Sequence, residues 1–568
     1  MKEVIAKILK KALAELKVKL TEAEILKYIE IPPNMEMGDY AFPCFFLASK
    51  MQEAPHEIAL EIREKISKIP EEFEDIESNG PYVNFFVNRK NQIPEIINEI
   101  LSKKEKYGKP ESKEKSRTMI EFSQPNTHKA FHVGHIRGTS LGESLARILE
   151  FSGEKIIRAN YSGDTGTHVA KWLWCYTKFH SKEKLRNDES WIAKIYVEAA
   201  KKYDDSEKNH KEVEVINWAM EGKKNPKLMQ LWKKSRKFSI DSWKKIYKEL
   251  NTKFDIHFFE SEVEKRGKDI AYELREKKIA VKSDEAIIMN LKKYNLGVWV
   301  LLRKDGTVLY SAKDIALVEK KFSKFKIDKS IMIIGAAQSL HISQLLKTLE
   351  LMKSENAKKN IFVPFAEVRL PSGKMSSRTG ENILYSDFMK ETLDLTKREI
   401  KKREEKISKT ELEKRALKIS IAAIKYSMLK QSPNKNIIFS KEDALNFDGD
   451  SGAYLLYSYA RAKSILKKAE NHSEKKSNYT EEIEDEEIKL AKMLALFPEI
   501  VGNAKKNLNP ALIANYSYKI AQSFNEFYHA CPVINSKNED FRKKLVQSFA
   551  FTIKNSLDLL GIEVLEKM

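Results

Sequence analysis

The stretch EFSQPNTHKAFHVGH, residues 121–135, is the most informative part of this sequence. The apolar run 118–122 that leads into it is typical of a buried strand, and apolar residues recur at helical spacing from His135 onward. A second apolar run, 155–161, predicts another strand within the length of one β-α-β unit. The stretch is therefore expected to join a strand to a helix in a parallel sheet, where helix N–H groups bind phosphate.

An H-x-G-H pattern, His132 to His135, lies at this junction. Two histidines that only cap the helix or face solvent would give the same pattern. A metal site is a weaker alternative, because the loop holds no cysteine or carboxylate at a usual ligand spacing. The position at the end of a strand favours contacts with a nucleotide.

A second run, PSGKMSSRTG at residues 371–380, combines glycine and serine with Lys374 and Arg378. Its hydroxyls, loop N–H groups and positive charges suit an anion. Alone, such a run is more typical of a basic surface loop. Its combination with the upstream H-x-G-H pattern is far more specific.

The composition indicates a globular protein with an anionic partner. The chain has 568 residues, 42% hydrophobic and 32% charged, so several domains with ample core are expected. A net charge of +20 favours nucleic acid as partner, although lysine runs alternating with glutamate runs make part of it solvated surface. The three distant cysteines predict no disulfides, no structural zinc and a reducing, cytoplasmic setting. No apolar run approaches the ~20 residues that span a bilayer.

Residues 1–110 are expected to form a small α+β domain. The amphipathic segment 1–20 predicts a surface helix rather than a targeting sequence, because it contains two glutamates and no arginine. A second helix is expected around 41–50, and a strand over 82–87 behind an Asn-Gly-Pro turn. The charged segment 103–115 is expected to be a linker.

Residues 111–390 are expected to form a strand-rich α/β part, with a helical insertion over about 170–300 whose tryptophans are core anchors. Further strands are expected over 298–302, 308–310 and 330–335. Residues 391–568 show helical periodicity and few strands, most clearly over 416–429, 453–467 and 489–497.

The H-x-G-H and K-M-S-S runs together resemble the signature of class I aminoacyl-tRNA synthetases. Over nearly its whole length the chain resembles the arginyl-tRNA synthetase family, whose motifs occur in order at 121–135, 160–167, 310–314, 335–341 and 447–461. The resemblance implies an N-terminal domain for the tRNA elbow (D-loop) over 1–110, a Rossmann-type parallel-sheet catalytic domain over 111–390 and a helical anticodon-binding domain over 391–568.

The resemblance also implies the reaction, that of an arginine–tRNA ligase that makes arginyl-adenylate from arginine and ATP and loads the 3′ end of tRNA(Arg). ATP with Mg²⁺, arginine and tRNA(Arg) are the implied ligands, and the protein is expected to be monomeric and not bound to a membrane. In this chemistry the protein positions substrates and offers donors to developing phosphoryl charge. The residues implied in catalysis are His132, His135, Lys374 and Lys129, and those implied in ATP binding are His132, Gly134, His135, Lys374, Met375, Ser376, Ser377 and Arg378.

The second run departs from the family's K-M-S-K-S pattern, because Ser377 stands where a second lysine is usual. Arg378 could supply the missing charge. Lys129 is the more interesting candidate, since family members that lack the loop lysine often carry a lysine at this upstream position. The departure is therefore no argument against activity.

A pocket that selects a guanidinium should offer oriented carboxylates and a flat or hydroxyl-bearing wall. Asp314 precedes an apolar helical run, so it is alternatively a helix N-cap. Glu121 ends a buried strand and needs a cationic partner. Asn126 and Gln338 are expected towards the α-amino end of the substrate. The residues that the resemblance implies for arginine are Glu121, Ser123, Asn126, His132, Tyr310, Asp314 and Gln338.

The resemblance implies tRNA contacts in both terminal domains. Near the N-terminus they involve Asn79, Tyr82 and Asn84, where the alternative is an ordinary strand edge. In the C-terminal domain the aromatics that would meet the anticodon loop are Tyr454 and Tyr457, whose alternative is core packing at helical spacing. The terminal Met568 also matches a family residue near the anticodon.

Other functions remain open on the sequence. One is a class I synthetase for lysine, which is also a cation, and the run at 310–314 together with the N-terminal domain favours arginine. Another is a non-catalytic tRNA-binding paralogue, against which the intact histidines and Lys374 argue. A cysteinyl enzyme is disfavoured, because no Cys/His set for zinc is present.

Overall fold

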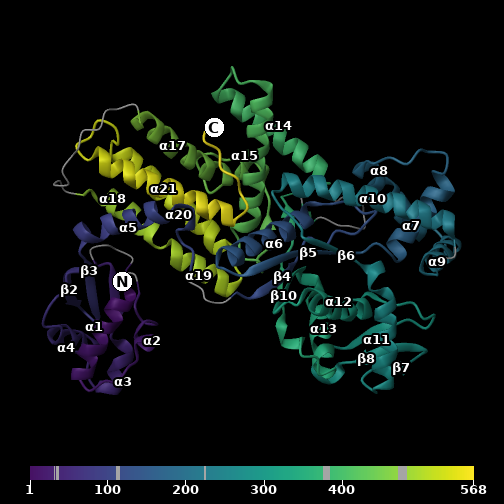
Figure 1. The fold of residues 1–568 in the computed structure, drawn as a ribbon, viewed down its shortest axis with the longest axis horizontal. Coiled ribbons are helices and arrows are strands. Elements are labelled where there is room, and N and C mark those ends of the chain that lie inside the picture. Colours follow the sequence, from purple (N-terminus) through teal and green to yellow (C-terminus); the bar gives the residue numbers. More distant parts are fainter. Residues whose placement is uncertain are drawn as a thin grey trace. The chain divides into compact units, whose positions relative to one another are not determined.

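A computed structural model describes the chain except for residues 31, 33–36, 111–114, 223–224, 372, 375–383 and 471–482, and except for the side chains of 89–91, 370, 373–374 and 470. The described residues fall into two compact units (Figure 1). Unit 1 comprises Met1–Lys103 and Thr480–Ala495. Unit 2 comprises Lys104–Tyr479 and Leu496–Met568.

Unit 1 is an antiparallel sheet covered by helices. The strand order is β1 (Tyr40–Pro43), β3 (Tyr82–Val87) and β2 (Phe73–Asn79), so β3 is central. Helices α1 (Lys2–Glu15) and α4 (Pro55–Lys65) bury their apolar faces with the sheet in one core. The predicted first helix and the strand over 82–87 are thus confirmed.

The helix predicted around 41–50 is wrong. Ala41 and Phe42 instead pair with β3 and bury their side chains within β1. Only η2 (Phe45–Leu47) and α3 (Ala48–Met51) are helical there. Further helices of unit 1 are α2 (Glu22–Ile25), α5 (Arg89–Lys103) and α18 (Asp485–Ala495), the last two in contact with each other.

Unit 2 is organised around a parallel sheet with the strand order β11 (Asn360–Phe365), β10 (Lys329–Gly335), β4 (Arg117–Glu121), β5 (Lys155–Ser162) and β6 (Ile256–Phe259). The predicted strands at 118–122, 155–161 and 330–335 and the Rossmann-type topology are confirmed. From β4 the chain builds outward to β5 and β6, and later returns to add β10 on the other side. The boundary between β4 and β10 is a topological switch point, where open parallel sheets bind ligands.

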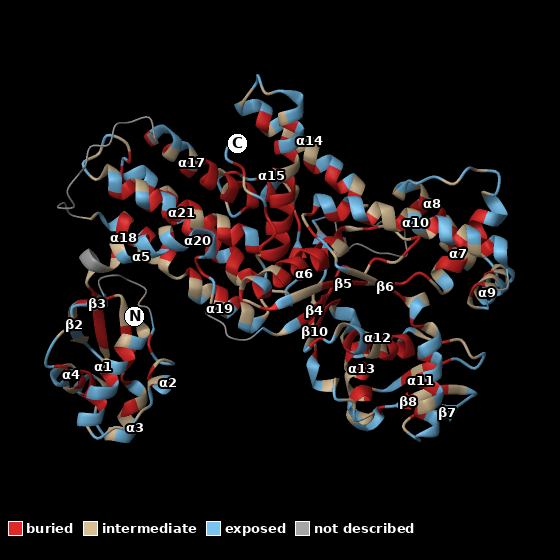
Figure 2. Cartoon of the chain, in the orientation of Figure 1, coloured by how far each residue is buried: buried red, intermediate tan, exposed pale blue. Residues whose placement is uncertain are grey.

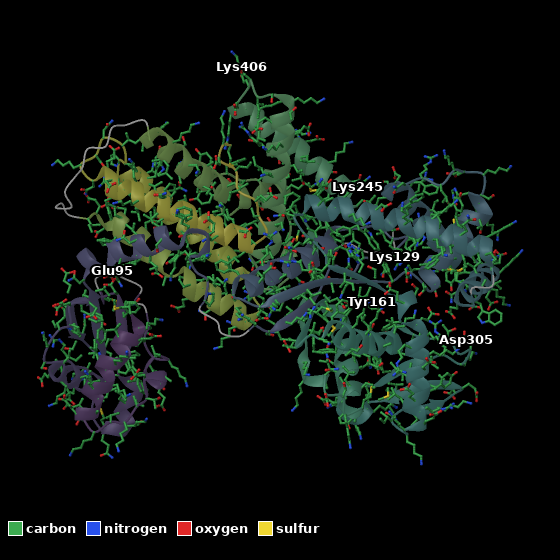
Figure 3. All side chains as sticks on the ribbon, viewed as in Figure 1. Glu95, Lys129, Tyr161, Lys245, Asp305 and Lys406 are labelled. Atoms are coloured by element: carbon green, nitrogen blue, oxygen red, sulfur yellow. The ribbon has the colours of Figure 1, made fainter. Side chains whose placement is uncertain are left out.

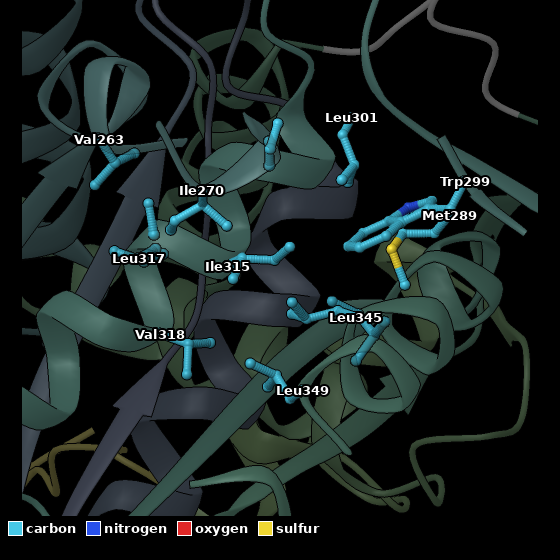
Figure 4. Close-up of a cluster of buried hydrophobic side chains, with 14 of the residues drawn as sticks. Val263, Ile270, Met289, Trp299, Leu301, Ile315, Leu317, Val318, Leu345 and Leu349 are labelled. Atoms are coloured by element: carbon cyan, nitrogen blue, oxygen red, sulfur yellow. The ribbon is translucent and has the colours of Figure 1, made fainter. Parts of the chain in front are cut away.

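Helices and a second sheet extend this framework. Helix α6 (Val133–Phe151) connects β4 to β5. An antiparallel sheet of β7 (Val281–Ser283), β8 (Ala286–Asn290) and β9 (Val298–Leu302) shares a core with α11 (Glu264–Glu276), α12 (Tyr310–Phe325) and α13 (Ser339–Leu351) (Figure 4).

The strand predicted over 308–310 is wrong. Val308 forms only an isolated bridge to Leu302, and Tyr310 already begins α12. The predicted strand over 298–302 exists as β9, but it pairs antiparallel with β8 rather than joining the central sheet.

Apart from α11, which follows β6, the insertion is helical only as far as Glu249, through α7 (Thr167–Phe179), α8 (Glu189–Asp204), α9 (Glu207–Glu221) and α10 (Pro226–Glu249). Beyond it, the chain returns to the central sheet as β6, because its apolar residues pair with β5. Most of the insertion's tryptophans are buried or partly buried, as predicted, but Trp218 is 61% exposed and is no core anchor.

The C-terminal part of unit 2 is mainly helical, as predicted. Figure 2 shows buried residues along α15, α20 and α21. Its helices are α14 (Tyr385–Arg403), α15 (Lys409–Leu429), α16 (Lys441–Ala444), α17 (Gly452–Glu470), α19 (Phe497–Asn507), α20 (Ala511–Ala530) and α21 (Glu539–Leu559). A small sheet joins β12 (Val368–Leu370) and β13 (Gly373–Lys374), which precede the helical part in sequence, to β14 (Ile437–Ile438), which follows α15. Within the described ranges, no helix is long and apolar enough to cross a membrane.

Candidate active site

The chain leaves β4 through a constrained loop. Ser123, Gln124 and His128 all adopt positive φ angles, of 77°, 53° and 64°, which L-residues rarely do. Buried hydrogen bonds stabilise this path: the His128 ring contacts the Thr127 hydroxyl at 3.0 Å and the Ser235 hydroxyl at 2.8 Å. Burial lowers the pKa of His128 to about 3, so this ring is a neutral structural element of the loop.

His132 and His135 cap the start of α6 reciprocally. His132 is the N-cap, and its Nδ1 accepts from the backbone N–H of Gly134 at 3.2 Å, while His135 Nδ1 accepts from the N–H of His132 at 3.2 Å. Burial, with the charge of Lys129 adding to it, lowers the pKa of His132 to about 4 and that of His135 well below the ordinary value. Both rings are therefore neutral at pH 7.

This capping fixes which nitrogen carries the proton. A backbone N–H can only donate, so Nδ1 of each histidine must be unprotonated and each neutral ring carries its proton on Nε2. The capping alternative is thus correct for the Nδ1 atoms, which both accept from backbone N–H groups at the start of α6. It leaves the Nε2–H of His132 and of His135 as donors for phosphate or ribose oxygens. Gly134 allows the close approach, because a Cβ there would lie 3.0 Å from the His132 ring.

Lys129 lies close enough to both histidines to lower their pKa values. Its ammonium lies 5.4 Å from the centre of the Tyr196 ring. Burial and the nearby Lys171 lower the pKa of Lys129, whereas Glu260 opposes them. Figure 3 marks Lys129 in the middle of unit 2.

The second signature run is described only in part. Lys374 ends β13, which pairs with β12 in antiparallel fashion, and its side chain lies outside the described residues. Met375, Ser376, Ser377 and Arg378 also lie outside them.

The described chain resumes directly beside the H-x-G-H loop. Leu384 forms a β-bridge with His132, and the N–H of Tyr385 donates to the carbonyl of Phe131 at 2.9 Å. From the insertion, Glu189 accepts from the N–H of Phe131 at 2.9 Å. The start of α14 and the residue before it are therefore held through the backbone against residues 131–132.

A cavity of about 400 Å³, called the amino-acid cavity below, lies at the switch point between β4 and β10. Its lining includes Glu121 at the end of β4, Asn126 from the following loop, Tyr310 and Asp314 on α12, and Gln338 just after β10. The volume suits a free amino acid. These predicted arginine-binding residues are thus brought together.

Ser123 and His132 are not among the residues that line this cavity. The Ser123 hydroxyl lies 2.9 Å from the Tyr247 hydroxyl and accepts from the Thr139 hydroxyl at 2.9 Å. It therefore contributes to the packing behind the loop. His132 lies at the start of α6, as its N-cap.

Glu121 has its cationic partner within the chain. Its Oε2 lies 2.5 Å from the ammonium of Lys321, and both side chains are almost completely buried. Its Oε1 accepts from the Gln124 amide at 3.0 Å. A cationic partner for Glu121 was expected from the sequence, but its identity was not. Lys321 lies two turns beyond Asp314 on the same face of α12.

Asp314 is not an N-cap. Leu309 caps α12, and Asp314 lies within the helix, so the capping alternative is wrong. Its Oδ2 accepts from His341 Nε2 at 2.6 Å. The His341 ring also lies 4.5 Å from the ring of Tyr310, which is 54% exposed and forms part of the cavity wall.

The opposite wall is formed by β5 and the loop after it. The Asn126 side-chain oxygen accepts from the N–H of Gly163 at 3.0 Å, and a Cβ on Gly163 would lie 2.5 Å from that oxygen. Glu260, paired with Lys313 at 3.1 Å, also lines the cavity.

The hydroxyl of Tyr161 is buried with no hydrogen-bond partner among the described residues, and Tyr161 lines the amino-acid cavity (Figure 3). A bound ligand would satisfy it. Sequence reasoning missed this residue and His341, although both fall inside quoted motifs, at 160–167 and 335–341. Glu260 and Lys321 carried no comparable signal.

The predicted tRNA-contacting residues near the N-terminus lie on the β2–β3 hairpin. Asn79 faces Tyr82 across it, and the Tyr82 ring packs edge-on at 5.6 Å against Phe45, which is 54% exposed. Asn84 is buried. Tyr82 and Asn84 lie on the central strand β3, so the strand-edge alternative is wrong for them, whereas Asn79 does lie on an edge strand, β2.

The predicted anticodon aromatics are half-buried on α17. The Tyr454 hydroxyl accepts from Asn525 at 2.8 Å, and the Tyr457 hydroxyl accepts from Arg461 at 3.1 Å. Neither ring is completely buried in the core. Met568, the last residue, is partly exposed and lies outside regular structure.

One group of side chains in the described residues has metal-ligand character. The ligand atoms of Cys175, His180 and Glu198 lie within 4.8 Å of one another. His180 is already held between Glu183 at 2.5 Å and Glu198 at 3.0 Å, and these carboxylates raise its pKa. Burial raises the pKa of Cys175 to about 12. A proton on His180 therefore satisfies this group without a metal.

A Rossmann-type sheet with H-x-G-H after its first strand, and with a cavity at the switch point, defines the catalytic domain of a class I aminoacyl-tRNA synthetase. Residues 96–441 match the family of class I (R) tRNA synthetase catalytic domains. Residues 3–87 match the arginyl-tRNA synthetase N-terminal domain, and residues 455–568 match the DALR anticodon-binding domain.

Relatives agree over the full length. The chain is 36% identical to an arginine–tRNA ligase of Clostridium perfringens, covering 97% of this chain and 98% of the relative. It is 35% identical to one of Clostridium acetobutylicum, covering 98% and 100%. The solved Thermus thermophilus arginyl-tRNA synthetase superposes with a TM-score of 0.80 at 25% identity, covering 100% of both chains. The chain belongs to the arginyl-tRNA synthetase family.

Proposed function

We propose that this protein is an arginine–tRNA ligase, which uses ATP to form arginyl-adenylate and transfers arginine to the 3′ end of tRNA(Arg). The observation that carries the proposal is the amino-acid cavity. It gathers Glu121, Asp314, Tyr310, Gln338 and Asn126 at the switch point of the sheet. A cation with a planar donor group suits such carboxylates and a tyrosine wall.

In the first step the arginine carboxylate attacks the α-phosphorus of ATP, and pyrophosphate leaves. The Nε2–H groups of His132 and His135 are donors held by the backbone before the reaction begins, so they stabilise developing phosphoryl charge without reorganisation. Lys129 adds a positive charge on the same side. We further assign to Lys374, with Met375, Ser376, Ser377 and Arg378, the closure over ATP, and to Mg²⁺ the neutralisation of the departing pyrophosphate.

The arginine side chain is proposed to extend into the amino-acid cavity. Asp314 and Glu121 would face the guanidinium, with Tyr310 as the wall, and Asn126 and Gln338 would lie towards the α-amino group. The buried Tyr161 hydroxyl is a further donor or acceptor for the substrate. Ser123 would act on arginine binding indirectly, through the packing of the loop. His132 would act where the arginine carboxylate meets the ATP phosphate.

The terminal parts are proposed to bind tRNA(Arg). We assign D-loop contacts to Asn79 and Tyr82 within residues 1–110, where Asn84 supports the strand from its buried position. We assign anticodon contacts to Tyr454, Tyr457 and Met568 within residues 391–568. The half-burial of both tyrosines leaves ring faces on which unstacked bases can stack. We also propose that the protein is a monomer and works in the cytoplasm.

The test is an aminoacylation assay with total tRNA and each of the twenty amino acids separately. The proposal requires ATP-dependent charging with arginine alone. Charging with lysine instead would establish the rival synthetase, and no charging with any amino acid by folded protein would establish a non-catalytic tRNA-binding protein.

A further inference from the structure

Three side chains from three separate elements form a hydrogen-bonded relay behind the amino-acid cavity. The indole N–H of Trp299, on β9, donates to His341 Nδ1 at 3.0 Å, and His341 Nε2, on α13, lies 2.6 Å from Oδ2 of Asp314, on α12. Trp299 is 4% exposed and lies beside Met289 in the core cluster (Figure 4). The relay thus connects a rigid core to a carboxylate that lines the cavity.

The chemistry of the indole fixes the state of the relay. A tryptophan N–H is a donor only, so His341 Nδ1 must accept and the neutral ring carries its proton on Nε2. That proton is donated to Asp314 Oδ2. A ring protonated on Nδ1 would place an N–H against the indole N–H and a lone pair against the carboxylate, and both contacts would be repulsive. The orientation of the Asp314 carboxylate therefore depends on Trp299.

The second carboxylate of the cavity is held differently. Glu121 is neutralised by Lys321, and its other oxygen already accepts from Gln124. Asp314, by contrast, is held through one oxygen by a neutral ring, which leaves its negative charge uncompensated by that contact. Of these two carboxylates, Asp314 is therefore the one whose charge remains for a cationic side chain that enters the cavity.

We propose that Trp299 is a positioning residue for amino-acid selection: by holding the Nε2–H tautomer of His341, it directs the free oxygen of Asp314 towards the substrate guanidinium. This inference rests on the proposed role of Asp314 in arginine binding. Trp299 does not touch the substrate. Its effect passes through His341 alone.

The kinetic test is Trp299→Phe, which keeps an aromatic ring in the core and removes the N–H. The KM for arginine should rise about 3- to 10-fold, the scale of one buried hydrogen bond, while kcat and the KM for ATP stay near wild type. The matched control is Trp174→Phe, which also removes a buried tryptophan with an indole–carboxylate hydrogen bond, here to Glu212, away from the cavity. It should leave the arginine KM unchanged.

A double-mutant cycle separates positioning from core packing. In a His341→Ala background, Trp299→Phe should have no further effect on the arginine KM, because the relay is already broken. Equal effects of Trp299→Phe in both backgrounds would overturn the proposal, since they would show that Trp299 acts through packing.

The tautomer can be measured on the wild-type protein. With isotopically labelled histidine, the NMR signals of His341, assigned by their loss in His341→Gln, should report a proton on Nε2. A proton on Nδ1 would overturn the relay. If instead the proposed role of Asp314 in arginine binding is wrong, Asp314→Asn would leave the arginine KM unchanged. The His341 tautomer would still be the expected one in that case, so the two failures can be distinguished.

Discussion

The two ends of the active site hold their functional groups by different means. At the end that we propose binds the nucleotide, called the nucleotide end, backbone N–H groups fix His132 and His135, and the constraint is local to one loop and one helix start. In the amino-acid cavity, side chains from distant elements fix the carboxylates, through Lys321 for Glu121 and through His341 for Asp314. Local constraints can be recognised from a short motif, whereas long-range ones depend on the complete fold.

The largest effect is expected from removing a long-range contact of the amino-acid cavity, the ion pair between Lys321 and Glu121. Lys321→Met removes the cation from a buried pair and leaves Glu121 charged, so the free energy of unfolding should fall by about 3–5 kcal/mol. Chemical denaturation measures it. Adding Glu121→Gln should restore most of the loss. The control is the adjacent Lys320→Met, which removes a partly exposed pair with Glu262 and should cost about 1 kcal/mol or less.

The next effect concerns the nucleotide end. Asn is as good an N-cap as any residue, so His132→Asn should keep α6 and the melting temperature close to wild type. It removes the Nε2–H donor, so kcat for charging should fall about 30- to 1,000-fold, as for the loss of one preorganised donor. A variant with wild-type kcat would mean that His132 acts only as a cap. Lys374→Ala should give a kcat loss of the same order.

The contact between Glu189 and the N–H of Phe131, next to His132, should depend on pH with a smaller effect. Burial raises the pKa of Glu189 to about 7. The stability that its protonated form contributes is present below the ordinary carboxyl pKa and is lost as the pH rises through about 7. Glu189→Gln keeps an acceptor for Phe131 without the charge, so it should be more stable than wild type at pH 8, by on the order of 1 kcal/mol, and similar at pH 5.

Thermal unfolding at the two pH values checks this prediction. The control is Glu207→Gln, at the equivalent first position of α9 and exposed, which should show no gain at pH 8. An equal gain in both variants would attribute the effect to surface charge rather than to the buried contact.

The sequence was most informative where structure is local. The run 118–122, the helix start beside His135 and the strand over 155–161 follow from spacing and loop chemistry, and each is found. The helix around 41–50 failed, because Ala41 and Phe42 pair with a strand far along the chain and tertiary pairing outweighs local preference.

In the amino-acid cavity, too, contacts between distant parts of the chain could not be predicted from the sequence. Glu121 and Asp314 were identified as candidates through the resemblance, and Glu121 was expected to need a cation. No spacing rule indicated that Lys321 supplies it, or that Trp299 lies behind His341, since these contacts form only when α12, α13 and β9 pack together.

The arginine kinetics of Asp314→Asn show whether a carboxylate of the amino-acid cavity selects the substrate. Asn keeps the size and an acceptor for His341, but removes the charge that should meet the guanidinium. Charged hydrogen bonds contribute roughly 1.5–3 kcal/mol, so kcat/KM for arginine should fall about 10- to 150-fold while the KM for ATP and the melting temperature stay near wild type. Wild-type kcat/KM for arginine in this variant would contradict the claim that a carboxylate of the cavity selects the substrate.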